Sequence, residues 1–238
     1  MNRSFWQAGH TPTLLSAFLY FDLSFMVWYL LGPMQVQIAQ ALQLDTQQRA
    51  LMVAVPILCG ALLRLPMGLL ADRIGSRRTG LLAQVVVIAA LLAAWHLGVH
   101  SFGQVLLLGV MLGVAGASFA VALPLASRWY PPQHQGTAMG IAGAGNSGTV
   151  LAALFAPALA AAFGYRNVFG LACLPLLVVL AVFTACARDA PVKVARKTLA
   201  DYARVLVGNR DSWWFMLFYA ITFGGFAGFA SALPGYFH

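Results

Sequence analysis

One long apolar run with a single arginine near its centre limits what this chain can fold into. The run covers residues 51–71, LMVAVPILCGALLRLPMGLLA, and its charged residue is Arg64. A membrane-spanning helix needs roughly 20 apolar residues, and a central arginine costs about 2.5–3.5 kcal/mol on insertion. Asp72 lies about 12 Å further along a helix, too far for easy pairing. Because guanidinium keeps its proton, this position predicts an anion path. A buried pairing, or a side chain that reaches the interface, is the structural alternative.

Composition places the whole chain in the membrane. Hydrophobic residues make up 61% of it and charged residues 8%, with no glutamate, whereas soluble domains hold about 25% charged residues. The net charge of +8 is compatible with nucleic-acid binding, but the basic residues lie between the apolar runs rather than on one folded face. The sequence therefore predicts an all-α integral membrane protein that contacts the lipid bilayer and no nucleic acid.

Seven apolar segments are predicted to be spans. They cover roughly residues 14–38, 49–70, 80–98, 104–129, 137–163, 167–187 and 213–236. With a cytoplasmic N-terminus, eleven basic residues fall in inner connections, and Arg49 and Arg166 fall outside. Positive residues favour the cytoplasmic side. We therefore predict a multi-pass protein of a bacterial inner membrane, with its N-terminus in the cytoplasm.

The long connection before the last segment divides the chain. We predict a six-span bundle over residues 1–187, a cytoplasmic linker over 188–212 and a seventh span over 213–238. Apolar linker residues recur at helical spacing: Leu199, Tyr202, Val205 and Leu206. With basic residues around them, they predict a helix on the membrane surface; a solvated basic loop is the alternative.

Small residues form stripes in the fourth and fifth segments. The stripes are Gly109, Gly113 and Ala117 in the fourth, and Gly136, Gly140, Ala144 and Gly148 in the fifth. Such stripes let membrane helices approach closely. Packing does not readily explain Asn146, a polar amide among glycines that also open the backbone to a passing ligand.

No set of residues in this sequence predicts an enzyme or a metal site. Cys59, Cys173 and Cys186 lie in apolar runs without metal-ligand spacing. No two of the serine, histidine, cysteine and aspartate residues form a spaced catalytic set. We therefore expect no enzymatic activity, no metal and no cofactor.

A charged motif connects the second and third segments. Residues 68–78, GLLADRIGSRR, resemble the loop motif G-x-x-x-D-R-x-G-x-R-R of the major facilitator superfamily. Its members here are Gly68, Asp72, Arg73, Gly75, Arg77 and Arg78. Gly68 predicts close contact between helices, and Asp72 predicts a helix cap or a partner for a basic group. The resemblance implies a role for this loop in conformational change.

Four further strings resemble the nitrate/nitrite porter family within that superfamily. They are GIAGAGNSGT (140–149), FDLSFMVWYLLGP (21–33), GALLRLPMG (60–68) and FYAITFGGFAGFASALPGYF (218–237). The resemblance implies a glycine-rich signature of Gly140, Gly143, Gly145 and Gly148. It also implies a substrate site of Arg64, Phe119, Asn146, Tyr219 and Phe223, with nitrate and nitrite as the partners and alternating access as the mechanism.

The chemistry of this residue set suits a small planar anion. A planar guanidinium offers two parallel N–H donors to two oxygens, and aromatic rings form a wall for a flat, weakly hydrated ion. Ordinary packing is the alternative for Phe119 and Phe223. A major facilitator that carries another small anion, and a non-transporting remnant, are the alternative functions.

Asp22 is the one acidic residue at predicted membrane depth. It is a candidate proton relay, a candidate partner for Arg64, or a helix-packing residue. A relay predicts proton symport with nitrate, because nitrate is too weak a base to carry a proton. A silent Asp22 predicts exchange of nitrate for nitrite.

The sequence also departs from the family pattern. The fold needs about twelve spans in two halves, and no second substrate arginine or second glycine signature follows here. We expect either a truncated product or a fragment, with the missing C-terminal half as a partner. We expect spans one to six to form a bundle of two inverted three-helix repeats, with span seven at its edge.

Overall fold

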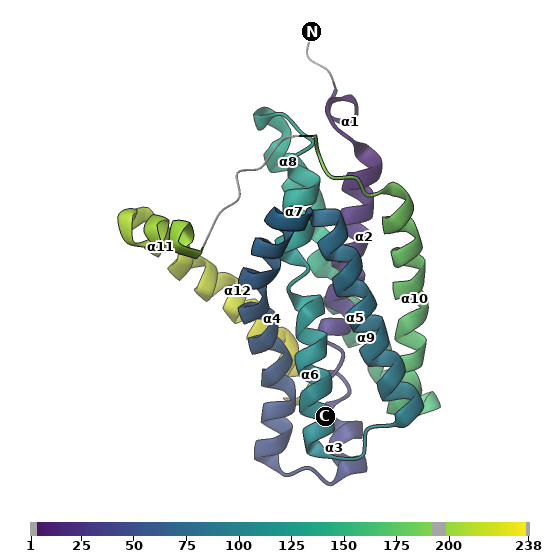
Figure 1. The fold of residues 1–238 in the computed structure, drawn as a ribbon. Helices are drawn as coiled ribbons and strands as arrows, with labels where there is room; N and C mark the ends of the chain where they lie inside the picture. The colour runs from purple at the N-terminus through teal and green to yellow at the C-terminus, as the bar shows by residue number, and fades with distance from the viewer. Residues whose placement is uncertain (1–3, 192–198, 237–238) are drawn as a thin grey trace.

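A computed structural model describes residues 4–191 and 199–236 of the chain (Figure 1). Every regular element in these ranges is a helix, as the all-α prediction requires. In chain order they are α1 (Phe5–Ala8), α2 (Thr11–Trp28), α3 (Gln35–Leu42), α4 (Thr46–Ile74), α5 (Ser76–Leu97), α6 (Phe102–Gly116), α7 (Phe119–Ser127), α8 (Pro132–Gly143), the 3₁₀-helix η1 (Ala144–Ser147), α9 (Gly148–Phe163), α10 (Tyr165–Cys186), α11 (Leu199–Gly208) and α12 (Arg210–Tyr236).

Within the described ranges, six helical stretches are long and apolar enough to cross a membrane. They are Thr46–Ile74, Ser76–Leu97, Phe102–Ser127, Pro132–Phe163, Tyr165–Cys186 and Arg210–Leu233. These six correspond to the second to seventh predicted segments. The first predicted segment corresponds to α2, which is not among them, so the predicted count of seven is not confirmed. The chain is a multi-pass membrane protein.

Three of the predicted segments are interrupted in the structure. The first ends as a helix at Trp28, and turns over residues 29–34 lead into α3. Pro33 lies in these turns, and proline lacks the N–H that a helix would use. The fourth segment breaks at residues 117–118 between α6 and α7, and the fifth breaks at η1. The η1 break falls in the glycine-rich signature, and a 3₁₀ turn inside a helix often marks a functional hinge.

Helix α2 lies at the centre of the bundle and packs against α10, α9, α7 and α6. Its Trp28 is almost fully buried. A Cβ at Gly60 of α4 would lie 2.6 Å from the indole, and one at Gly116 of α6 would lie 2.3 Å from it. The indole Nε1 donates a hydrogen bond to the Pro56 carbonyl oxygen of α4 at 2.7 Å. Trp28 therefore fixes three helices against one another.

The two predicted glycine stripes behave differently. In the fourth segment, Gly109 and Gly113 lie against Pro56 and Cys59 of α4, so close approach is confirmed there. In the fifth segment, a Cβ at Gly136 or Gly140 would meet no atom within 4 Å. Gly148, the last member of the predicted stripe, does lie against Asp22 and Met26 of α2, and Gly145, outside the stripe, lies against Phe21 and Asp22. The predicted close approach is therefore confirmed at Gly148 and wrong at Gly136 and Gly140.

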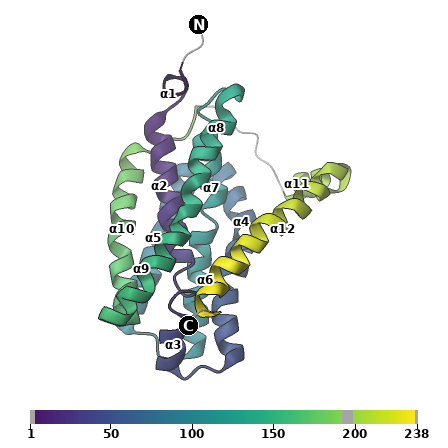
Figure 2. The same ribbon diagram turned by 180° about the vertical axis from the view of Figure 1, so that it is seen from behind.

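The last two helices lie to one side of the bundle. Figures 1 and 2 show α12 running obliquely beside α4, with α11 further out. Helix α12 contacts α4, and most of its large apolar residues are exposed. The helix predicted from the spacing of apolar residues in the connection is present as α11, and its position on a membrane surface stays a prediction. Arg196 and Lys197, predicted beside it, lie outside the described residues.

Candidate anion site

Arg64 is carried near the middle of α4, a helix of 29 residues. The helix begins with a capping box, in which the Asp45 carboxylate accepts from the Gln48 N–H at 2.8 Å and the Gln48 side chain accepts from the Asp45 N–H at 3.2 Å. Such reciprocal bonds satisfy two backbone donors of the first turn. Helix α4 therefore starts at a defined residue, and Arg64 lies well within the length of this helix rather than at either end.

Three aromatic rings from three segments surround the Arg64 guanidinium. Its Cζ lies 4.4 Å from the ring centroid of Phe223 in α12, 5.1 Å from Phe119 in α7 and 5.7 Å from Trp28 in α2. A cation within about 6 Å of an aromatic face is attracted by the ring quadrupole. These rings therefore hold the charge at a position where no carboxylate of the described ranges forms an ion pair with it.

Tyr219 completes this group of aromatic residues. Arg64 Nη1 donates a hydrogen bond to the Tyr219 hydroxyl oxygen at 2.9 Å. The Tyr219 and Phe223 rings are stacked, with centroids 5.0 Å apart and an interplanar angle of 5°. The structure thus brings together four of the five residues that the resemblance assigned to a substrate site: Arg64, Phe119, Tyr219 and Phe223.

One edge of the guanidinium is left without a partner. Arg64 Nε and Nη2 are both buried and form no hydrogen bond with the residues that the structure describes. These two nitrogens carry the parallel N–H groups of the guanidinium fork, the geometry that matches two oxygens of a planar anion. Buried donors without acceptors cost free energy. We call Arg64 and the residues around it, Trp28, Phe119, Tyr219 and Phe223, the arginine cage. The arginine cage therefore holds a fixed positive charge and two guanidinium donors without acceptors.

Asn146 lies in η1, apart from the contacts that define this group. Its Oδ1 is buried without a hydrogen-bond partner. Segment η1 packs against α2, where a Cβ at Gly145 would lie 2.6 Å from the Phe21 ring. The Phe21 ring in turn lies 5.8 Å from that of Phe119. Asn146 is thus linked to the arginine cage through packing rather than through a direct bond.

The four glycines of the signature divide into two pairs. Gly145 and Gly148 lie against α2, and a Cβ at Gly148 would overlap the Asp22 carbonyl oxygen. A Cβ at Gly140 or Gly143 would meet nothing within 4 Å. The first pair therefore allows close approach of α2, and the second pair leaves the backbone accessible.

Asp22 is bound to the signature segment and not to Arg64. It is 8% exposed, and Ser147 Oγ lies 2.6 Å from its Oδ1. Ser147 Oγ also lies 2.8 Å from the Ala144 carbonyl oxygen. The ion pairs found between described residues are Arg128–Asp72 and Arg204–Asp201, so no cation neutralises Asp22 among them. The alternative in which Asp22 pairs with Arg64 is absent from the structure.

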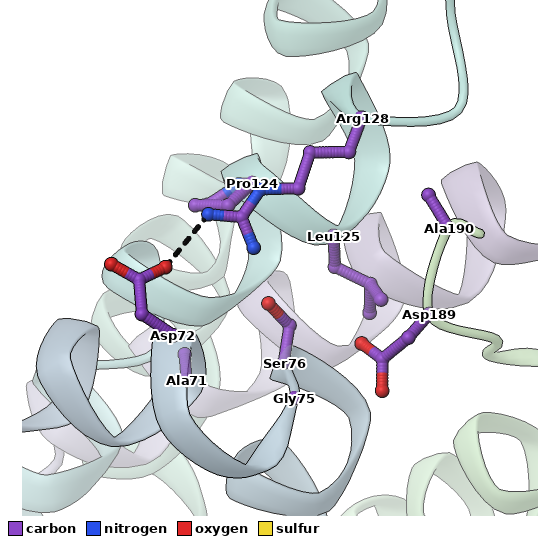
Figure 3. A pocket seen from close by; sticks show the side chains of 9 residues that line it. All are labelled: Ala71, Asp72, Gly75, Ser76, Pro124, Leu125, Arg128, Asp189 and Ala190. Atoms are coloured by element: carbon purple, nitrogen blue, oxygen red, sulfur yellow. Dashed lines mark hydrogen bonds and ion pairs between the residues drawn. The ribbon is translucent and has the colours of Figure 1, made fainter. Parts of the chain in front are cut away.

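The loop motif forms a polar cluster at one end of the bundle. Arg128 Nη2 lies 2.9 Å from Asp72 Oδ1, so Asp72 pairs with a basic group, one of its two predicted roles (Figure 3). The Tyr202 hydroxyl of α11 donates to Asp72 Oδ2 at 3.2 Å. Burial, followed by the nearby Asp72 carboxylate, raises the pKa of Tyr202 above its ordinary value. Asp72 therefore joins α4, α7 and the linker helix.

The second half of the motif is held by Asp189. Gly75 adopts φ +95°, and a Cβ there would lie 2.5 Å from an Asp189 carboxylate oxygen. The Arg77 backbone N–H donates to Asp189 Oδ1 at 3.0 Å. Arg73 and Arg78 are exposed. The close helix contact predicted at Gly68 is wrong, because a Cβ there would meet no atom within 4 Å.

Sequence reasoning missed several residues that the structure places at these two sites. They are Trp28, Arg128, Ser147, Asp189 and Tyr202. Trp28 and Ser147 lie inside sequence strings that carried the family resemblance, so those strings contained a signal that could have identified them as site residues. The contacts of Arg128, Asp189 and Tyr202 with the loop motif join residues 56 to 130 positions apart, and no local spacing predicts them.

Similarity to characterised sequences agrees with this arrangement. The Probable nitrate/nitrite transporter NarK2 of Mycobacterium tuberculosis is 34% identical over 237 residues, covering 96% of this chain and 58% of the relative. The Nitrite extrusion protein of Bacillus subtilis is 31% identical over 212 residues, covering 89% and 53%. The Probable nitrate/nitrite antiporter NarK1 of Thermus thermophilus is 31% identical over 232 residues, covering 92% and 52%. The chain spans about half the length of these relatives.

The match to a family is broader than the match to any one motif. Residues 17–238 match the Major Facilitator Superfamily, a range that includes the loop motif, the arginine cage and α12. The names of these three relatives describe transport or extrusion of nitrate or nitrite. The chain therefore belongs to the Major Facilitator Superfamily and falls within its nitrate/nitrite porter family.

Proposed function

We propose that this protein binds nitrate and nitrite at Arg64 and moves them across a bacterial inner membrane by alternating access. The observation that carries this proposal is the unpaired, buried edge of the Arg64 guanidinium. Two parallel donors there match two oxygens of a planar anion. The aromatic residues Trp28, Phe119 and Phe223 form flat walls and bring no negative charge. Tyr219 orients the guanidinium and adds a hydroxyl.

The names of the similar proteins support the same substrates. Nitrate and nitrite are small, planar and delocalised, so they fit a site with one fixed charge and several rings. A second half of the fold would supply the rest of an anion site between two bundles. On this proposal, residues 1–187 form the first bundle, 188–212 the cytoplasmic linker and 213–238 a span of the second half.

The orientation follows from the basic connections. Arg73 lies in the last turn of α4, Arg77 and Arg78 lie in the first turn of α5, and Arg128, which follows α7, pairs with Asp72. Because positive residues favour the cytoplasmic side, we assign this end and the N-terminus to the cytoplasm. The loop motif would then act at the cytoplasmic end, where the Asp72–Arg128 ion pair and Tyr202 tie α4, α7 and the linker together.

The surroundings of Asp22 favour proton symport over exchange. Its Oδ1 accepts a hydrogen bond from the Ser147 hydroxyl at 2.6 Å, and no cation of residues 4–191 or 199–236 forms an ion pair with it. A buried carboxylate without a paired cation is costly, so Asp22 is the group that would take up a proton when nitrate binds. Exchange of nitrate for nitrite remains the second candidate.

Nitrate binding to the purified protein tests the site. Isothermal titration at constant ionic strength should give saturable nitrate and nitrite binding, with chloride and sulfate much weaker. Arg64→Gln should abolish the heat of nitrate binding. Arg166→Gln, on the predicted outer side of the membrane, should preserve it. Equal affinity for chloride, or nitrate binding that survives Arg64→Gln, would refute the proposed substrate site.

The coupling is tested by the same titration in two buffers with different ionisation enthalpies. Symport predicts uptake of a proton with each nitrate in the wild type and none in Asp22→Asn. Ser147→Ala serves as the positional control and should shift the pH dependence without removing nitrate binding. Proton uptake that is unchanged in Asp22→Asn would favour exchange, or a relay at another residue.

A further inference from the structure

A cavity lies at the Asp72 end of the bundle, between the start of α5 and the end of α10. Its volume is about 500 Å³. It is lined by Arg77, Arg78, Thr184, Ala185, Ala187, Arg188 and Asp189. Helices α5 and α10 pack against one another over their length (Figure 1). The anion site proposed above does not use this cavity.

Three arginines give the cavity a positive wall. Arg77 is fixed in place, because its Nη2 donates to the Thr184 carbonyl oxygen at 2.7 Å and its backbone N–H is held by Asp189. Arg78 and Arg188 form no ion pair with any carboxylate of residues 4–191 or 199–236. The lining therefore contains three arginines and one carboxylate, and two of the arginines have no counterion in the described part of the chain.

The surface that continues from the cavity along the two helices is apolar. One turn beyond Arg78, Leu82 of α5 is 56% exposed, and Val85 is also exposed. On α10, Val178 is 63% exposed, and Leu177 is also exposed. The side chains that follow the arginines along both helices are thus suited to hydrocarbon, and the arginines themselves are suited to an anionic group.

We propose that this cavity binds the phosphodiester headgroup of an anionic phospholipid, whose acyl chains lie along the apolar faces of α5 and α10. Guanidinium groups bind phosphate oxygens through paired donors. Basic pockets between membrane helices at the interface are suited to such headgroups. A soluble phosphate compound shares the headgroup chemistry, but it would leave the adjoining apolar faces unused. The combination of a charged cavity and exposed apolar helix faces therefore favours an anionic phospholipid over a soluble phosphate compound.

Lipid titration of the full chain followed by native mass spectrometry tests the assignment. One phosphatidylglycerol should bind about tenfold more tightly than phosphatidylcholine, since each basic residue near an anionic surface contributes severalfold. The variant Arg78→Gln with Arg188→Gln should lose this preference. The matched control, Arg204→Gln with Arg210→Gln, removes the same charge elsewhere and should keep it. No preference in the wild type, or an unchanged preference in the cavity variant, would overturn the proposal.

Two further measurements separate the lipid from a soluble anion. Glycerol phosphate and inorganic phosphate should fail to displace bound phosphatidylglycerol at equimolar concentration; displacement by either would overturn the lipid assignment. If the double variant does not fold, phosphatidylglycerol with a diazirine on its acyl chain can be crosslinked to the wild type. Labels should appear on the exposed residues of α5 and α10 named above, and labelling confined to other helices would overturn the proposal.

Discussion

Arg64 and Arg128 are two arginines in one bundle with opposite surroundings. Arg128 is paired with the Asp72 carboxylate at 2.9 Å, and its side chain is 29% exposed. Arg64 is surrounded by rings and a hydroxyl, and its Nε and Nη2 have no partner. A buried charge that serves packing is normally paired. The comparison separates a charge neutralised within the protein from one that is left for a mobile ion.

Their neighbours differ in the same sense. The Asp72 cluster uses the Asp72–Arg128 ion pair (Figure 3), the Tyr202 hydroxyl and a backbone contact of Asp189, all within the chain. The Arg64 cage uses aromatic residues that attract a cation without neutralising it. The first arrangement stabilises one conformation. The second keeps a positive potential available to a ligand.

The largest expected effect is that of Arg64→Lys. Lysine keeps the charge but loses the planar pair of donors, and a hydrogen bond to a charged group contributes about 1.5–3 kcal/mol. We expect nitrate affinity to fall about 10- to 100-fold, with normal membrane insertion, by titration calorimetry and membrane fractionation. Arg128→Lys, which keeps a cation beside Asp72, should leave nitrate affinity nearly unchanged. If Arg64→Lys bound nitrate with wild-type affinity, Arg64 would be a structural residue, and the functional difference drawn between Arg64 and Arg128 would be wrong.

The second prediction tests the paired arginine. Asp72→Asn leaves Arg128 without its counterion, and we expect the free energy of unfolding to fall by about 1–3 kcal/mol, less than for a fully buried pair. Nitrate affinity should be unchanged. Thermal unfolding of Asp72→Asn, Arg128→Gln and the double variant gives the coupling energy. Strictly additive effects would mean that the observed ion pair contributes nothing.

A smaller effect is expected for the walls of the cage. Phe223→Leu removes the ring 4.4 Å from the Arg64 guanidinium but keeps an apolar side chain. Cation–π attraction contributes about 0.5–2 kcal/mol, so nitrate affinity should fall about 2- to 10-fold. Phe229→Leu, at an exposed position of the same helix, is the control. An equal loss in both variants would reduce the role of Phe223 to helix packing.

The smallest effect is expected for Tyr202→Phe. The substitution removes the hydroxyl that donates to Asp72 at 3.2 Å, a part-exposed bond. A hydrogen bond of this kind contributes about 0.5–1.5 kcal/mol, so the loss should be near the lower end. Hydrogen exchange should increase in α11 and stay unchanged in α4. Unchanged protection of α11 would show that another contact holds the linker helix.

Periodic and composition-based features of the fold could be predicted from the sequence. Apolar runs indicated the membrane class, and regular spacing predicted a helix at α11 and close helix contact at Gly109 and Gly113, which the structure places against α4. The breaks at residues 29–34 and at η1 were not predicted, because a run remains apolar whether or not its backbone hydrogen bonds continue. Small residues at regular spacing likewise predicted contacts at Gly136 and Gly140 that the structure lacks.

The candidate site also has features that the sequence predicts and features that depend on the fold. A lone arginine in an apolar run is visible in a sequence, and family strings indicated Phe119, Tyr219 and Phe223. The free edge of Arg64 could not be predicted, because it depends on which nitrogen Tyr219 contacts. The partner of Asp72 was predicted by type, as a basic group, but its identity required the fold, since Arg128 is 56 residues away.

The packing of Trp28 also has a consequence for sequence variation among relatives. A side chain at residue 60 or 116 would occupy the volume of the indole, and a smaller residue at 28 would leave a void between α4 and α6. The three positions are therefore expected to covary: while tryptophan is kept at position 28, glycine is required at the other two. Substitution at any one of them is expected to be accompanied by changes at the other two. Covariation of these residues across homologues would therefore test this packing independently of the anion chemistry.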